Sequence, residues 1–155
     1  MGSDSLSGET AERRFRTLFI SDVHLGARGS QADRLLDFLR SHDADTIYLV
    51  GDIVDGWALK SYWHWSQSHN DFVQKLLRKA RKGVKVIYVP GNHDEFLRKY
   101  YGTHFGGIDV VENTIHTGAD GGAISSSTAI FSISWCRTRA GSPISATRHT
   151  TSRSR

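Results

Sequence analysis

The stretch VKVIYVPGNHDEF, residues 84–96, joins an apolar, β-branched run to a polar cluster that begins directly after it. The first six residues have the composition of a buried strand. A proline and a glycine then end the strand, and a plain turn would need little more than these two residues. The chain nevertheless presents Asn92, His93 and Asp94 together at this point. Their presence calls for a role beyond turning the chain.

Two earlier stretches repeat this arrangement. The strand-like run RTLFIS (16–21) leads into SDVHLG (21–26), and TIYLV (46–50) leads into GDIVDGW (51–57). In open α/β sheets, ligands bind just beyond the carboxyl ends of the strands. We therefore expect the three polar clusters, which are far apart in the sequence, to meet at one edge of a sheet.

Two amphipathic segments separate the predicted strands. QADRLLDFLR (31–40) has apolar residues at helical spacing, with Ser30 as the expected N-cap. NDFVQKLLRKARKG (70–83) follows the same pattern, with Asn70 as the expected N-cap and Gly83 as the stop. The sequence thus predicts an α/β fold of order β-α-β-α-β, with parallel strands and right-handed crossovers.

The polar clusters contain the side chains of a metal site. Asp22, His24, Asp52 and Asn92 offer carboxylate, imidazole and amide ligands without sulfur, a set that suits manganese, iron, zinc or magnesium. Asp52 is placed to bridge two ions, which would hold a phosphoryl group between them. His93 would then face the substrate and stabilise or protonate the leaving oxygen. The alternative for each single cluster is a turn that caps the next helix.

Two further features have open interpretations. Asp55, in the same cluster as Asp52, either supports the metal ligands or forms the turn. A loop-like aromatic stretch (56–65) would line a substrate pocket or pack against the sheet, and its aromatic residues are Trp57, Tyr62, Trp63 and Trp65.

The three motifs FISDVHLG, LVGDIVDGW and VPGNHDEF resemble those of the calcineurin-like metallophosphoesterase superfamily, and residues 16–120 look most like its bacterial UDP-2,3-diacylglucosamine hydrolase group. The resemblance implies the N-terminal half of an αββα sandwich. It also implies that Asp22, His24 and a bridging Asp52 hold one divalent metal, that Asp52 and Asn92 hold a second, with manganese favoured, and that His93 is the catalytic imidazole. The implied reaction releases UMP from a UDP-linked diacylated glucosamine in lipid A synthesis.

The end of the chain departs from that pattern. All 16 acidic residues lie in residues 1–120, whereas residues 121–155 contain five arginines, nine serines and no acid. The later histidine motifs of the superfamily, H-G and G-H-x-H, have no match here. We therefore expect a flexible segment at 1–15, a partial metallophosphoesterase domain at 16–120 and a disordered basic tail at 121–155. Metal affinity and turnover should then be low, and part of the apolar face of the sheet should be uncovered.

A frameshift near Gly121 is the hypothesis that explains this tail. If Ser125, Ser126 and Ser127 use TCN codons, a shifted frame encodes an apolar run, and the triplets that follow it can encode His-Gly-Asp. AGY codons at these serines would exclude it. A noncatalytic module whose basic tail binds nucleic acid or an anionic membrane is the alternative, although the charge alone indicates no specific nucleic acid.

The sequence also limits the cellular compartment in which we expect the protein. The single Cys136 allows neither an intrachain disulfide nor a thiolate zinc site. The first twelve residues lack the apolar core of a secretory signal, and no run has the length of a membrane span. We therefore expect a cytoplasmic protein, in peripheral contact with the inner membrane if it acts on a lipid-linked sugar.

Overall fold

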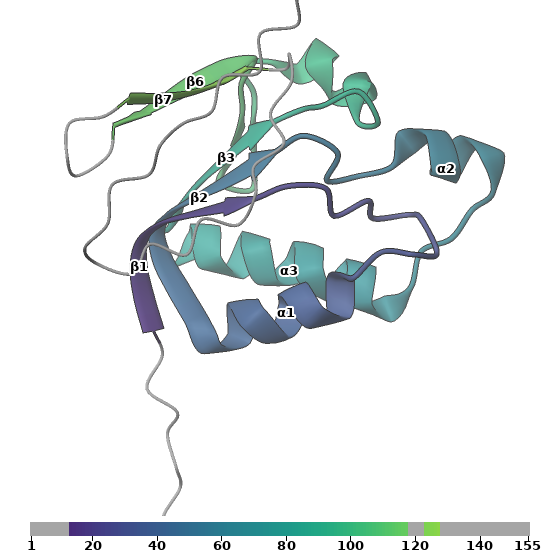
Figure 1. The fold of residues 1–155 in the computed structure, drawn as a ribbon, viewed down its shortest axis with the longest axis horizontal. Coiled ribbons are helices and arrows are strands. Elements are labelled where there is room, and N and C mark those ends of the chain that lie inside the picture. The colour runs from purple at the N-terminus through teal and green to yellow at the C-terminus, as the bar shows by residue number, and fades with distance from the viewer. Residues whose placement is uncertain (1–12, 118–122, 128–155) are drawn as a thin grey trace, which may run out of the picture.

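The computed structural model describes residues 13–117 and 123–127. Its main sheet contains three long parallel strands in the order of the sequence, followed by two short strands, so the sheet order is β1-β2-β3-β5-β4. Only β4 runs antiparallel to its neighbour. The predicted α/β architecture is confirmed (Figure 1). The strands of this sheet are β1 (Arg13–Ile20), β2 (His42–Val50), β3 (Lys85–Val89), β4 (His104–Phe105) and β5 (Ile108–Val110).

Two helices cover one face of this sheet. α1 (Ala32–Ser41) connects β1 to β2, and α3 (Gln67–Arg81) lies between β2 and β3, beside α1 (Figure 1). Each turns its apolar stripe toward the strands, as the helical spacing predicted. The core between helices and sheet includes Ala32 and Leu39 of α1 and Phe72 and Leu76 of α3, all buried.

Both helix starts differ from the prediction. Ser30 does not cap α1, because its hydroxyl donates to the carbonyl of Val23. α3 begins three residues before Asn70, and its N-cap is Ser66, whose hydroxyl accepts a hydrogen bond from the N–H of His69. The predicted stop is confirmed, since Gly83 follows the helix with a φ of 96°, a conformation that glycine adopts without strain.

Two helical turns lie within stretches that read as loops. α2 (Gly56–Ser61) occupies part of the aromatic stretch after β2, and the 3₁₀ helix η1 (Glu95–Tyr100) follows the third polar cluster. Sequence periodicity misses both, because six residues are too few to show a helical repeat.

A second, two-stranded sheet lies on the face opposite the helices (Figure 1). It pairs β6 (Asn113–Thr117) with β7 (Ala123–Ser127) in antiparallel fashion. His116 of β6 stands edge-on to the rings of Phe19 and Tyr48 in the main sheet. The apolar side chains on this face are buried, so the expectation of an uncovered face is wrong for them. They are Tyr48, Val50, Ile87 and Val89.

The predicted segment boundaries shift accordingly. Arg13, Arg14 and Phe15 are paired with β2, so the first three residues of β1 lie within the predicted flexible N-terminal segment. β7 is a strand within the range 121–155 that was expected to be a disordered tail. The rest of that range and residues 1–12 lie outside the described residues. Within the described part of the chain, none of the helices has the length and apolar character that a membrane span requires.

Candidate metal and catalytic site

Three loops meet at the carboxyl ends of β1, β2 and β3, as predicted. The loops after β1 and β2 run alongside each other, because the N–H of Leu25 donates to the carbonyl of Ile53 and the N–H of Asp55 donates to the carbonyl of Leu25, each over 2.8 Å. The loop after β3 joins them through the N–H of Gly56, which donates to the carbonyl of His93. Backbone hydrogen bonds therefore hold the three polar clusters together.

The backbone is strained at three of the predicted ligands. Asp22, His24 and Asp52 have φ values of 52°, 51° and 54°, and they are the only non-glycine residues with positive φ in the described ranges 13–117 and 123–127. This left-handed conformation is unfavourable for residues with a Cβ, and it concentrates at functional sites. Because all three residues are metal-ligand candidates, this strain indicates that the positions of their side chains serve a function.

These three side chains form one cluster. Asp22, His24 and Asp52 each offer a ligand atom, and these atoms lie within 4.8 Å of one another. Asp22 is exposed and the other two are half-buried, so the cluster opens to solvent. Two carboxylates and one imidazole are a donor set that first-row divalent metals accept. The residues therefore fit a divalent ion.

Asn92 and His93 come from the third loop. The side chain of Asp52 accepts a hydrogen bond from the N–H of His93 over 2.9 Å, which places this loop against the cluster. Gly91 makes this approach possible, because a Cβ at that position would lie 2.6 Å from Oδ1 of Asp52. Asn92 is exposed, and its place as a metal ligand remains a prediction.

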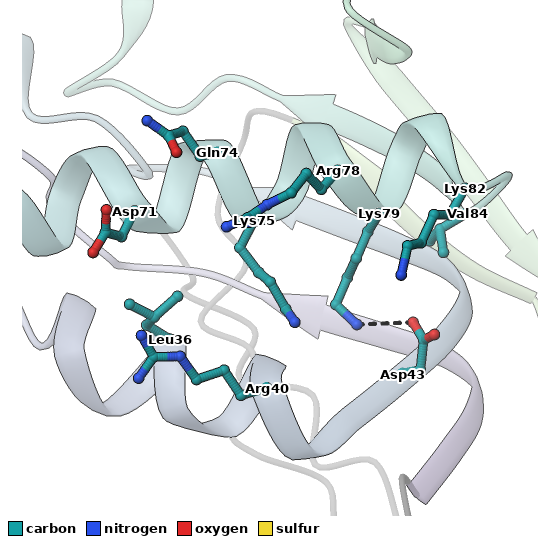
Figure 2. A pocket seen from close by; sticks show the side chains of 10 residues that line it. All are labelled: Leu36, Arg40, Asp43, Asp71, Gln74, Lys75, Arg78, Lys79, Lys82 and Val84. Atoms are coloured by element: carbon teal, nitrogen blue, oxygen red, sulfur yellow. Dashed lines mark hydrogen bonds and ion pairs between the residues drawn. The ribbon is translucent and has the colours of Figure 1, made fainter.

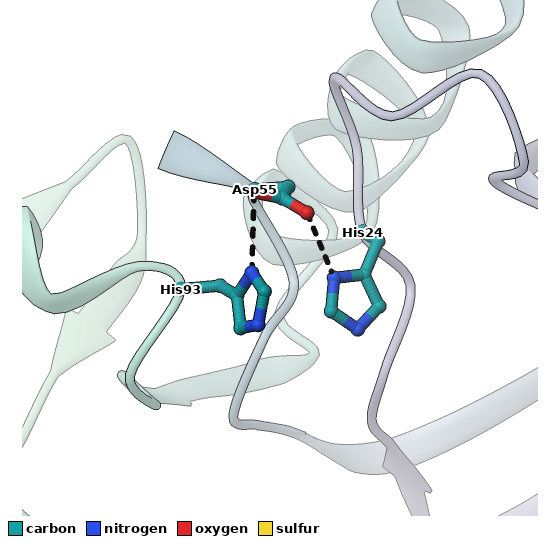
Figure 3. Close-up of side chains that lie close together, drawn as sticks. All are labelled: His24, Asp55 and His93. Atoms are coloured by element: carbon teal, nitrogen blue, oxygen red, sulfur yellow. Dashed lines mark hydrogen bonds and ion pairs between the residues drawn. The ribbon is translucent and has the colours of Figure 1, made fainter. Parts of the chain in front are cut away.

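Asp55 lies between two imidazoles (Figure 3). One carboxylate oxygen is 3.2 Å from Nδ1 of His24, and the other is 3.2 Å from Nδ1 of His93. The His93 contact has ion-pair distance but not the geometry of a hydrogen bond, so this buried Nδ1 atom has no hydrogen-bond partner. The three side chains also form a second group that could hold a metal ion. Asp55 is thus part of the site, which its sequence pattern alone left open.

Asp55 has a structural role as well. It is the N-cap of α2, and its side chain accepts a hydrogen bond from the N–H of Ala58. Burial opposes ionisation of Asp55, but this hydrogen bond and the contacts with His93 and His24 outweigh it. They hold the pKa of the Asp55 carboxyl below its usual range. The carboxylate is therefore charged at neutral pH and orients both imidazoles.

Asp94 is a residue that sequence reasoning missed. Its side chain is fully buried and accepts hydrogen bonds from the N–H groups of Gly91 and Ile53 and from the hydroxyl of Tyr88. Burial and the nearby Asp94 raise the pKa of Tyr88, so the phenol stays protonated and donates. Asp94 thereby ties the loop after β3 to the loop after β2. The signal in the sequence was a third polar residue directly after Asn92 and His93.

An aromatic surface adjoins the imidazoles. The ring of Trp57 lies 4.3 Å from that of His93, centre to centre, and Trp57 is 46% exposed. Phe96, which lies close to Gly56, is exposed as well. Tyr62 and Trp63 are exposed rather than packed against the sheet. Trp65 packs against the hydrophobic core, so packing accounts for Trp65 but not for the three exposed rings of this stretch. The ring of Trp57 is available to a bound molecule.

Comparisons with known proteins agree with this geometry. The sequence model of the calcineurin-like phosphoesterase family matches residues 15–133. A protein of Xanthomonas campestris pv. campestris (strain B100) named UDP-2,3-diacylglucosamine hydrolase is 34% identical over 93 residues, which are 58% of this chain and 37% of that protein. The protein of that name from Cellvibrio japonicus is 31% identical over 102 residues, 64% of this chain and 42% of its own.

A relative with another name also matches part of this chain. The DNA polymerase II small subunit of Methanothermobacter thermautotrophicus is 32% identical over 103 residues, covering 54% of this chain and 21% of the subunit. The chain thus spans well under half the length of these relatives. No solved structure gives a significant match. Since the family model covers most of the chain and its strand-end motifs form the cluster described above, the chain belongs to the calcineurin-like phosphoesterase family.

Proposed function

We propose that this protein is a metal-dependent hydrolase of phosphate esters whose substrate is a UDP-linked diacylated glucosamine, split at the pyrophosphate to release UMP. The observation that carries the hydrolase assignment is the cluster of Asp22, His24 and Asp52, with His93 held beside it by Asp55. The substrate is supported by the names of the two bacterial relatives. If the protein acts on this substrate, we place it in the cytoplasm with peripheral access to the inner membrane.

The proposed ligands divide between two ions. Asp22, His24 and Asp52 would hold one, and Asp52 with Asn92 would hold the other. Manganese is the favoured metal, with magnesium, iron or zinc as alternatives. Two bound divalent ions neutralise charge on phosphate oxygens and acidify water. Asp55 contacts Nδ1 of His24, and the hydrogen bond from the N–H of His93 fixes one oxygen of Asp52.

His93 has a defined task in this arrangement. Its Nδ1 atom faces Asp55, so Nε2 is the ring nitrogen left to contact a substrate (Figure 3). A proton on Nε2 can be donated to the oxygen that leaves phosphorus. Trp57, in contact with the His93 ring, offers a flat apolar surface to the uracil or sugar of the substrate.

The test is release of UMP from UDP-2,3-diacylglucosamine by the chain loaded with manganese. Because the H-G and G-H-x-H motifs of the superfamily have no match in this chain, we expect slow release, which depends on metal and is abolished by EDTA. His93→Ala should lower it by about 10²–10⁴-fold, the usual contribution of general acid catalysis. His104→Ala is the matched control, because His104 is an exposed imidazole on β4 outside the site. UMP release that is unchanged in His93→Ala would contradict the proposed role of His93.

A second candidate is a phosphoesterase that acts on another phosphodiester or on a nucleotide. The match to a DNA polymerase subunit favours testing it, since a protein with a different name is similar to about half of this chain. Bis-p-nitrophenyl phosphate and the lipid-linked sugar nucleotide should be assayed side by side. Faster hydrolysis of the chromogenic diester, with no UMP release, would favour this candidate. The proposed binding module with a basic tail depends on residues outside the described ranges.

A further inference from the structure

A recess of about 580 Å³ lies between α1 and α3 (Figure 2). It is formed by the middle and end of α1, by α3 from Asp71 to its C-cap Lys82, by the start of β2 and by the residue before β3. The candidate metal site lies at the carboxyl ends of the strands, so the recess lies toward the opposite edge of the sheet. Its lining residues are Leu36, Arg40, Asp43, Asp71, Gln74, Lys75, Arg78, Lys79, Lys82 and Val84.

Positive charge dominates this lining. Five side chains are cationic and two are carboxylates. Lys79 is buried and donates to Asp43 over 2.9 Å, so this pair neutralises itself. Arg40 is paired with Asp37, outside the recess. Within the described part of the chain, Arg78 and Lys82 have no ion-pair partner.

The favourable interaction of cations with the helix dipole explains only part of the positive charge around the recess. Cations in the last turn of a helix interact favourably with its dipole, and Arg40, Arg78 and Lys79 occupy such positions. Lys75 lies before the last turn of α3, and in Figure 2 its ammonium group extends from α3 toward α1. Cations from two facing helices around one recess repel each other, and an anion bound between them would relieve that repulsion.

The shape and the carboxylates define the ligand. Asp71 lies at one end of the cationic stretch, so a long polyanion would have to pass a negative charge there, whereas Asp43 at the other end is already paired with Lys79 (Figure 2). The cations line a hollow, whereas a membrane surface needs cations that protrude. The volume lies within the range of sites for small molecules. We propose that the recess binds a soluble small molecule with two or more adjacent phosphates.

Inorganic triphosphate is the probe, titrated calorimetrically into the full chain in EDTA, so that no divalent metal can carry the anion to the other site. We expect saturable binding to one site. Lys75→Gln combined with Lys82→Gln should weaken it by about tenfold or more, since each lost cation removes a charge-assisted contact. The control is Arg34→Gln combined with Arg81→Gln, which removes the same charge from exposed positions of α1 and α3 outside the recess. It should change the affinity by less than about twofold.

Three outcomes would overturn the proposal. They are equal weakening in both double variants, binding that does not saturate, and triphosphate binding that is absent while phosphatidylglycerol vesicles or a single-stranded oligonucleotide bind through Lys75 and Lys82. Melting temperatures of both double variants without ligand show whether each still folds. If the first double variant does not, Arg78→Gln alone provides the same comparison, because Arg78 is exposed and lines the recess.

Discussion

Asp52 accepts a hydrogen bond from the backbone N–H of His93 across two loops that are 41 residues apart in the sequence. The same carboxylate belongs to the cluster with Asp22 and His24. One side chain therefore carries the charge of the proposed metal site and also fixes the position of the proposed catalytic imidazole. This double role can be separated by substitution.

Asp52→Asn should weaken manganese binding by at least about tenfold while the chain stays folded. The amide oxygen of asparagine still accepts the His93 N–H, but the negative charge that holds a cation is lost. Asp52→Ala should lose both functions and unfold at a lower temperature. Manganese titration with a melting curve for each variant measures the two effects. Asp45→Asn, an exposed carboxylate in β2, is the control, and unchanged manganese affinity in Asp52→Asn would show that Asp52 is not a ligand.

Two substitutions of Asp55 likewise separate its structural role as a helix cap from the role of its charge. Asp55→Ala removes the cap of α2 and should lower the free energy of unfolding by about 1 kcal/mol. Asp55→Asn keeps an oxygen for the Ala58 N–H and should cost less, yet both variants lose the charge that faces His24 and His93. Both should therefore lose hydrolysis to a similar extent. Full activity in Asp55→Asn, measured as UMP release, would show that the charge of Asp55 has no part in the reaction.

Asp94 should contribute to stability more than any exposed carboxylate. Asp94→Ala leaves two buried backbone N–H groups and the Tyr88 hydroxyl without an acceptor, at a cost of about 2–4 kcal/mol. Tyr88→Phe removes one of the three hydrogen bonds and should cost about 1 kcal/mol. Urea unfolding measures both. Equal costs for the two variants would mean that the backbone contacts of Asp94 add nothing.

The sequence could predict the elements whose signal is local. The strands at 16–21, 46–50 and 84–89 and the two long helices follow from apolar runs and helical spacing, and the position of the site follows from strand order. The position of the helix starts could not be predicted, because Ser66 and Asn70 are both good caps and tertiary packing decides between them. The role of Asp94 was hidden because two of its three partners are backbone groups, which a sequence does not distinguish.

Lys79 is a charged residue whose environment could not be predicted from the sequence either. Its position near the end of α3 predicts a solvated cation that suits the helix dipole. The structure instead buries it against Asp43 and the carbonyl of His42, which lie 36 and 37 residues earlier in the chain. A pair over that distance leaves no pattern in a single sequence.

The pair of Asp43 and Lys79 should make stability fall at acid pH. Burial opposes ionisation of Asp43, but the hydrogen bonds from Lys79 and from the N–H of Ala44 outweigh it and hold the pKa of Asp43 below its usual 3.8. A carboxyl group whose pKa is lower in the folded than in the unfolded state stabilises the fold at pH values above its unfolded-state pKa. This stabilisation is lost as the pH falls through the folded-state pKa. Asp43→Asn should therefore cost about 1–3 kcal/mol in urea unfolding at pH 6, and the difference from the unchanged chain should shrink below pH 3.8. Asp37→Asn breaks an exposed pair and should cost less than about 1 kcal/mol. A cost for Asp43→Asn that stays constant from pH 6 to below the folded-state pKa would show that the charge of Asp43 does not stabilise the fold.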